Sequence, residues 1–197
     1  LELINKYHFG VIINTKSNLV CRDLDILERI KEHSPVAVNV TITTSNNDLS
    51  KKLEPNVCST NERFMAISKI ADRNIINGII LMPILPYIND SIENIIELIE
   101  LAERTKAKWI YPGNCFGVTL REGQRGYFYK HLEDLFPGLK QQYIASFGSR
   151  KEGISPNNII LKKTFKDNCS KKGLLSDMCD IICLIKKGYD SPQLSLF

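Results

Sequence analysis

The chain has 197 residues, a formal net charge of +4 and 43% hydrophobic residues, a composition typical of a globular protein with one sizeable core. Its longest apolar runs, such as GIILMPILPYI, are far too short to span a bilayer. The first residues, LELINKYHFG, lack the basic start, apolar core and cleavage site of a signal peptide. These features exclude a membrane-spanning protein and predict a cytoplasmic one without membrane contact.

Positive charge is concentrated in the C-terminal third. Residues 121–188 carry 13 Lys and Arg against 7 Asp and Glu, whereas the rest of the chain carries 13 against 15. This excess permits contact with a polyanion, but a solvated lysine face explains it equally well. Six cysteines without a CxxC pair are typical of free thiols in a cytosolic protein. Cys179 and Cys183 share one face of a predicted helix, which favours two small buried side chains over a metal site.

The first 118 residues alternate short apolar strands with helices. Strands are predicted over 11–14, 36–42, 78–82 and 108–111. The intervening segments carry helical patterns over 23–33 and 49–53 and two N-terminal cap signals, one at Ser59 with Glu62 and one at Ser91. The order βαβαβαβ implies parallel strands with right-handed crossovers, forming a doubly covered sheet or the wall of a barrel.

After Gly117 the pattern becomes helical. Four helices are predicted over 124–136, 139–147, 156–169 and 176–187. Ser155 and Pro156 fit the N-cap and first position of the third of these helices, while Gly173 and Gly188 fit helix ends. We therefore expect an α/β unit over 1–118, a helical segment over 119–188 and a flexible tail over 189–197.

Polar residues follow the apolar strands directly. Lys16 ends the first strand, Thr41 and Thr43 end the second, and Pro83 and Ile84 follow the third. In parallel α/β proteins, ligands bind where the carboxyl ends of the strands meet the loops. One lysine and several hydroxyls suit a small anionic or nucleotide-like ligand. The sequence has no glycine-rich phosphate loop, HExxH or GxSxG motif, and its three histidines stand apart from any base–nucleophile pattern.

An ordered set of segments covers nearly the whole chain and resembles the spore photoproduct lyase-like group of radical SAM proteins. These segments are NTKSNLVCRDLDIL, VAVNVTITT, DLSKKLEPN, the ERF triplet, GIILMPILPYIND and FGVTLREGQRGYFYKHLEDLFPGL. The resemblance implies a partial (β/α)6 barrel with four of six strands present. It also implies S-adenosylmethionine (SAM) and a [4Fe-4S] cluster that cleaves SAM to a 5′-deoxyadenosyl radical, acting in nucleic-acid repair or modification.

The same resemblance assigns cofactor-binding positions. Lys16 and Thr41 match residues that bind the SAM carboxylate, and Thr43 lies on the same strand end. The other matching positions, near the site or against the adenine, are Glu54, Arg63, Pro83 and Ile84. Simpler interpretations stay open for three of these residues. Lys16 would be a solvated strand-end lysine, Thr41 a β-former, and Arg63 an ion-pair partner on a helix surface.

Two departures from the family pattern matter. The three cysteines of the CxxxCxxC cluster motif are absent, and none of the six cysteines replaces them by spacing. We therefore expect a C-terminal portion or a truncated product of such an enzyme, without its cluster ligands. Gly153 also stands near a position where relatives often carry a cysteine. The alternatives are a cluster-less barrel that binds nucleic acid or a sliding clamp, and an unrelated barrel enzyme that binds a phosphorylated metabolite.

Two C-terminal features point to partners. One is a group of polar and aromatic residues that would grip nucleic acid or pack the helices onto the barrel: Thr119, Arg121, Gln124, Arg125, Tyr127 and Tyr129. The other is the final QLSLF, which resembles the bacterial sliding-clamp-binding peptide. In that motif a glutamine fixes the register and apolar side chains fill a pocket. The predicted contact residues are Gln193, Leu194, Leu196 and Phe197.

Overall fold

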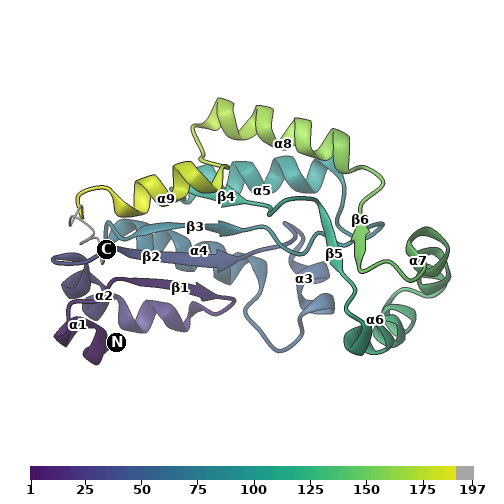
Figure 1. The fold of residues 1–197 in the computed structure, drawn as a ribbon, viewed down its shortest axis with the longest axis horizontal. Coiled ribbons are helices and arrows are strands. Elements are labelled where there is room, and N and C mark those ends of the chain that lie inside the picture. Colours follow the sequence, from purple (N-terminus) through teal and green to yellow (C-terminus); the bar gives the residue numbers. More distant parts are fainter. Residues whose placement is uncertain (190–197) are drawn as a thin grey trace, which may run out of the picture.

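Four parallel strands form the central sheet of the computed structural model, which describes residues 1–189 (Figure 1). The strands are β1 (Val11–Thr15), β2 (Val36–Thr41), β3 (Ile76–Ile80) and β4 (Trp109–Tyr111). Their spatial order follows their order in the chain, and each neighbouring pair is parallel, as the sequence pattern predicts. The four strands are confirmed, whereas a six-stranded barrel stays a prediction.

Strand β3 lies two residues earlier than the predicted range 78–82. A polar residue, Asn77, interrupts the apolar pattern at the start of this strand and hides it from sequence reasoning. Asn77 is fully buried, and its Nδ2 donates to the carbonyl of Ile75 at 3.1 Å. Beyond the end of the strand, the N–H of Leu81 still donates to the carbonyl of Tyr111 at 2.8 Å.

Helices connect the strands. Along the chain they are α1 (Glu2–Lys6), the 3₁₀ helix η1 (Asn18–Asp23), α2 (Leu24–Lys31), α3 (Asn47–Leu53), α4 (Thr60–Asp72) and α5 (Ile92–Arg104). The 3₁₀ helix at the start of the predicted helix 23–33 was not expected. Both predicted caps are confirmed, because Ser59 forms a reciprocal capping box with Glu62 and Ser91 accepts a hydrogen bond from the N–H of Asn94.

The two faces of the sheet are covered differently, because successive side chains of a strand point to opposite faces. Val38 and Ile110 represent the face that packs into the main core with α2, α4 and α5. Ala37 and Trp109 represent the other face, which packs against Ile181 and its neighbours on a C-terminal helix. We call this second side the inner face.

A small second sheet was missed by sequence reasoning. Strands β5 (Gly117–Thr119) and β6 (Glu152–Ile154) are antiparallel. Between them lie α6 (Glu122–Leu135) and α7 (Leu139–Phe147), which share a core of their own with the sheet (Figure 1). Each strand is only three residues long and contains a glycine, and the pairing joins segments far apart in the chain. No local pattern in the sequence therefore signals it.

The last two helices are α8 (Asn158–Lys172) and α9 (Met178–Lys186). Ser155 is not the N-cap of α8 as predicted, because the helix begins at Asn158 after Asn157. The hydroxyl of Ser155 instead donates to Asp90 Oδ2 at 2.5 Å and accepts from the N–H of Asn157 at 3.0 Å. The stop at Gly173 is confirmed by its left-handed φ of 67°.

The paired cysteines of α9 are exposed, contrary to prediction. Helix α9 buries Ile181 and Ile185 instead, so Cys179 and Cys183 lie on its outer side. Within residues 1–189, no helix is long and apolar enough to cross a membrane. The predicted clamp-binding tail, Gln193 to Phe197, lies outside the described residues.

Candidate functional site

A cleft of about 840 Å³ opens at the carboxyl ends of the parallel strands. Four of the predicted cofactor-binding residues contribute to its lining, namely Lys16, Thr43, Glu54 and Pro83. The opposite wall comes from α6 and the segment before it. The volume lies within the range of small-molecule sites, which is about 300–1,000 Å³. The structure thus brings strand-end residues from three separate segments to one cavity, as the position rule for parallel sheets predicts.

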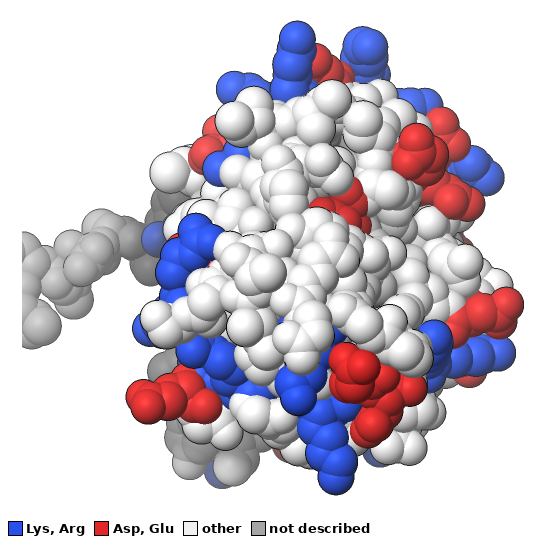
Figure 2. Space-filling view, turned by 90° about the vertical axis from the view of Figure 1, so that its right-hand side faces the viewer, with Lys and Arg blue, Asp and Glu red and all other residues white. Residues whose placement is uncertain are grey.

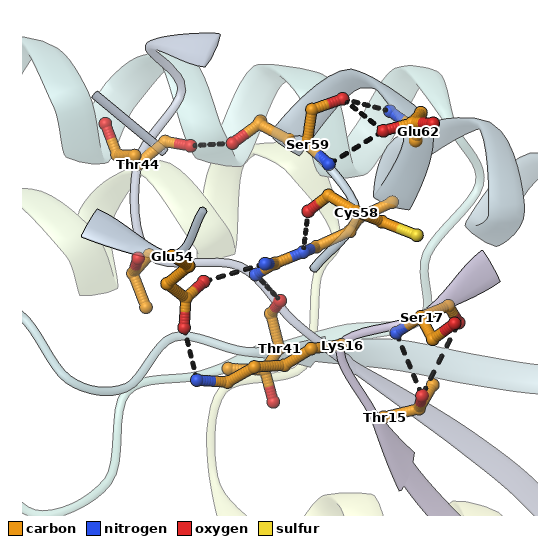
Figure 3. A network of polar contacts seen from close by, with 12 residues as sticks. Thr15, Lys16, Ser17, Thr41, Thr44, Glu54, Cys58, Ser59 and Glu62 are labelled. Carbon is orange, nitrogen blue, oxygen red and sulfur yellow. Dashed lines mark hydrogen bonds and ion pairs between the residues drawn. The ribbon is translucent and has the colours of Figure 1, made fainter. Parts of the chain in front are cut away.

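Glu54 links two cations beside this cleft (Figure 3). One carboxylate oxygen accepts from the ammonium group of Lys16, and the other accepts from Arg63 Nη2 at 2.7 Å. Arg63 is only 1% exposed. It also donates to the carbonyl of Thr41 and to the carbonyl of Cys58, each at 2.8 Å. The buried Arg63 side chain therefore connects the end of β2 to the loop that holds Glu54 and Cys58.

Local structure places each member of this network. The N–H of Ser17 donates to Thr15 Oγ1 at 3.0 Å, so the chain turns directly after β1 with Lys16 inside the turn. Glu54 is the C-cap residue directly after α3, and its N–H donates to the carbonyl of Ser50 at 2.8 Å. The capping box of α4 fixes the start of the helix that carries Arg63 in its first turn.

The network keeps Glu54 ionised. Partial burial of this carboxyl raises its pKa. The hydrogen bonds and charges of Lys16 and Arg63 lower the pKa by more than burial raises it, so it lies below its ordinary value. Two cations and one carboxylate leave this three-residue network with a net charge of +1. Lys16 has three N–H donors and uses one of them on Glu54, so it can bind a ligand oxygen as well.

The remaining predicted residues have different positions. Thr41 takes part through its carbonyl, which Arg63 holds. The carbonyl of Thr43 accepts from Asn89 and Asn94, which fixes the loop after β2. Ile84 is 1% exposed and belongs to the main core, so its side chain is not part of the cleft. Arg63 is not on a helix surface, contrary to the simpler interpretation of it.

The cleft wall around α6 includes Tyr127, which the sequence analysis selected, together with His131, Phe136 and Lys52 of α3, which it did not. The ammonium group of Lys52 lies 4.1 Å from the centre of the Phe136 ring, and the rings of Tyr127 and His131 are 4.2 Å apart at the cleft. The spacing of Tyr127 and His131, four residues apart on a helix, is the one signal that places them on a shared face. These side chains supply aromatic surface opposite Lys16.

The polar and aromatic group around the start of α6 divides into two kinds. Arg125 donates to the carbonyls of Leu120, Ser149 and Arg150 at 2.9–3.0 Å, and Tyr129 is 9% exposed. The packing interpretation therefore describes these two residues. Tyr127 is 71% exposed and free to contact a ligand. Figure 2 shows the end of the molecule that carries α6 and α7, where basic and acidic side chains both lie around a largely uncharged centre.

Comparisons with known proteins support this view of the fold. No family model matches the sequence. The structure is similar to a cysteine-to-alanine mutant of spore photoproduct lyase, with a TM-score of 0.59 and 14% identity over 88% of this chain and 54% of that chain. A mutant of the same enzyme with bound AdoMet and dinucleoside spore photoproduct gives the same values. The likeness establishes the fold.

Relatives of similar sequence carry no functional name. Uncharacterized proteins of Mycobacterium tuberculosis and Mycobacterium bovis are 27% identical over 131 residues, which cover 66% of this chain and 38% of theirs. The chain thus spans about 38% of the length of the curated relatives that it matches. The expected resemblance to the lyase-like group is confirmed at the level of the fold.

Proposed function

We propose that this chain forms the SAM-binding side of a radical SAM protein of the spore photoproduct lyase-like group, acting on nucleic acid. The observation that carries the proposal is the position of Lys16. Its ammonium group lies at the edge of a cleft at the carboxyl ends of the strands, in a fold shared with an enzyme solved with bound AdoMet.

The cleft residues suit SAM chemically. Lys16 would hold the carboxylate as a point charge, and the Glu54 carboxylate beside it would accept from the amino group of SAM. Apolar and aromatic side chains, among them Pro83 and Phe136, offer surface for the adenine and exclude water from the bound ligand. When bound, SAM would supply the methionyl and adenosyl groups on which radical chemistry acts.

The iron–sulfur cluster does not fit the described residues. Within residues 1–189, no group of three or more His, Cys, Asp and Glu side chains is placed to hold a metal ion. In the proposed function, residues 1–189 therefore account for ligand binding and orientation and not for radical generation. In the proposed function, cluster ligands come from polypeptide other than residues 1–189.

Calorimetric titration of the purified chain with SAM tests the proposal. Lys16→Gln should weaken SAM binding by at least about tenfold, because a hydrogen bond to a charged group contributes about 1.5–3 kcal/mol. Lys166→Gln is the matched control, since Lys166 is an exposed lysine on α8, and it should bind SAM like the wild type. Absence of SAM binding, or equal affinity of Lys16→Gln and the wild type, would refute the proposal.

The non-enzymatic alternative predicts a different result in the same assay. A cluster-less module would bind oligonucleotides without binding SAM. Tyr127→Ala should then weaken oligonucleotide binding by about 1–3 kcal/mol, the range for loss of one base–aromatic stack. Binding of SAM that depends on Lys16 favours the proposed function instead.

Clamp binding through QLSLF is a second proposal, supported by the sequence of the tail alone. Deletion of 193–197 should abolish retention of the protein on an immobilised bacterial sliding clamp. Replacement of the tail by a scrambled pentapeptide of the same composition is the control and should behave like the deletion. Unchanged retention in either variant would contradict the proposal.

A further inference from the structure

One row of side chains crosses the inner face of the sheet from edge to edge. Asn14 on β1 is the register partner of Asn39 on β2, Asn39 is the partner of Gly78 on β3, and Gly78 is the partner of Trp109 on β4. The four residues therefore lie side by side on neighbouring strands. Three of them carry polar groups, and the fourth has no side chain.

The absence of a side chain on Gly78 allows Trp109 to reach Asn39 across β3. A Cβ atom on Gly78 would lie 2.2 Å from the Trp109 ring, so only glycine permits the indole to lie across β3. The indole Nε1 thereby reaches Asn39 Oδ1 at 2.9 Å, and Asn39 Nδ2 donates to Asn14 Oδ1 at 2.8 Å. Trp109 is 1% exposed and Asn39 is 8% exposed, so this relay is shielded from water over most of its length.

The donors and acceptors along this relay follow from chemistry. An indole N–H can only donate, so the atom of Asn39 that faces it must be the carbonyl oxygen. Asn39 therefore presents its NH₂ group to Asn14, and the atom of Asn14 that faces it must also be an oxygen. The usual ambiguity of asparagine orientation is removed at both positions. The NH₂ group of Asn14 then faces away from the relay with two N–H donors, and no residue among 1–189 accepts from it.

Asn14 stands beside residues of the proposed SAM site. It is exposed, unlike the other members of its row. Thr41 lies two residues beyond Asn39 on β2 and so on the same face, and Lys16 directly follows Thr15, whose register partner is Val40. Helix α9 covers the opposite, Trp109 side of this face through Ile181. The side of the inner face that includes Asn14, Lys16 and Thr41, which we call the donor corner, therefore carries amide, ammonium and hydroxyl groups.

We propose that the donor corner binds an oxyanion, a carboxylate or a phosphate, and that Asn14 is a binding residue that donates to it through an amide N–H group. A group with only acceptor atoms complements an oriented amide donor beside a lysine. The inference rests on the proposed function in one respect, since Lys16 and Thr41 serve the same site there. The role of Asn14 is new, and it follows from the relay.

Side-chain NMR of the ¹⁵N-labelled chain tests the role of Asn14 directly. Three probes are used, namely SAM, inorganic phosphate and adenosine, of which the last has no oxyanion. SAM or phosphate should shift the NH₂ resonances of Asn14, and adenosine should not. The indole N–H of Trp109 should keep its shift, because it is bonded to Asn39 throughout. Asn14 resonances that stay in place with SAM and with phosphate overturn the inference.

Asn14→Asp supplies the matching variant. The aspartate still accepts from Asn39, so the relay and the urea midpoint should be kept, but both donors are replaced by anionic oxygen. Affinity for SAM, or for phosphate, should fall at least about tenfold. Asn168→Asp on α8 makes the same change in charge elsewhere and should bind like the wild type. Wild-type affinity in Asn14→Asp overturns the inference.

The outcomes separate this inference from the proposed function. If SAM binding depends on Lys16 but not on Asn14, the proposed function stands and the inference fails. If phosphate shifts the Asn14 amide while SAM does not bind, the corner is an oxyanion site and the SAM proposal fails. If no probe binds, both fail.

Discussion

The two halves of the parallel sheet are held by different kinds of interaction. In the β3–β4 half, Trp109 lies across Gly78 and packs against α9. In the β1–β2 half, the strand ends are held by charges, with Glu54 between Lys16 and buried Arg63. Packing gives the sheet a fixed frame, whereas the charged network can respond to a ligand or to pH. The two halves should therefore fail under different perturbations.

The two outer edges of the sheet also differ, in whether their backbone is paired. Beyond β4, Leu175 forms a parallel bridge with Trp109 and exchanges backbone hydrogen bonds of 3.0 and 3.1 Å with Ile110 and Lys108. Beyond β1, no strand among residues 1–189 pairs with the edge, and Ile12 is 55% exposed there. Within residues 1–189, the outer edge of the packed half is therefore paired and that of the charged half is not.

The largest effect is expected from removal of the buried cation. Arg63→Met keeps most of the side-chain volume but leaves Glu54 with one partner and two carbonyls without a donor. Breaking a buried pair in this way costs about 3–5 kcal/mol, measured by urea unfolding. The control is Arg73→Met at the end of the same helix, where the arginine is 43% exposed and its ion pairs lie at the surface.

The control should change the free energy of unfolding by about 1 kcal/mol or less, because exposed ion pairs contribute little. If Arg63→Met and Arg73→Met lower the free energy of unfolding equally, burial of the Arg63 network does not determine how much it stabilises the protein. The charged half would then be no different from the protein surface.

A smaller loss is expected from disturbance of the packed half. Gly78→Ala places a Cβ atom 2.2 Å from the Trp109 ring, so the indole must move away from Asn39. Overpacking of this kind costs about 1–3 kcal/mol. Because Trp109 is the single tryptophan of the chain, a red shift of its fluorescence would report the movement directly.

Gly126→Ala is the matched control for the packed half. Gly126 lies within α6, and nothing lies within 4 Å of the position of its added Cβ. Alanine is favoured over glycine in a helix by about 1 kcal/mol, so this variant should be more stable than the wild type. A Gly78→Ala protein of wild-type stability and fluorescence would contradict the role of Gly78 in the row.

The same contrast explains what the sequence revealed. The four parallel strands and both serine caps follow from local patterns, because apolar runs and cap signals act over a few residues. Lys16 and Glu54 could be selected from strand ends and from the family resemblance. The burial of Arg63 could not be predicted, because it depends on the end of β2 at Thr41 lying against the loop before α4 that holds Glu54 and Cys58.

Features that depend on register were also out of reach. The row from Asn14 to Trp109 depends on the register of four strands. Taken alone, Gly78 is a residue that weakens a strand, so it gives no signal of the row. Strands β5 and β6 pair across two helices. In each case the deciding contact joins distant segments, so no window of the sequence contains it.

The smallest effect is a pH dependence confined to the charged half. The pKa of Glu54 lies below its ordinary value of 4.5, because Lys16 and Arg63 outweigh the opposing effect of burial. On acidification the unfolded chain therefore binds a proton at this residue before the folded protein does. The stabilisation is complete above pH 4.5 and is lost as the pH falls through the lower, folded pKa.

Glu54→Gln isolates this contribution. The variant should be less stable than the wild type at pH 6.5, and the gap between their urea midpoints should narrow as the pH falls well below 4.5, where the wild-type carboxyl becomes protonated. Gly78→Ala should show no such narrowing, since Gly78 and its neighbours in the row carry no titrating group. A gap for Glu54→Gln that stays constant with pH would show that the shape of this side chain, and not its charge, holds the β1–β2 half. The distinction between the two halves of the sheet would then be lost.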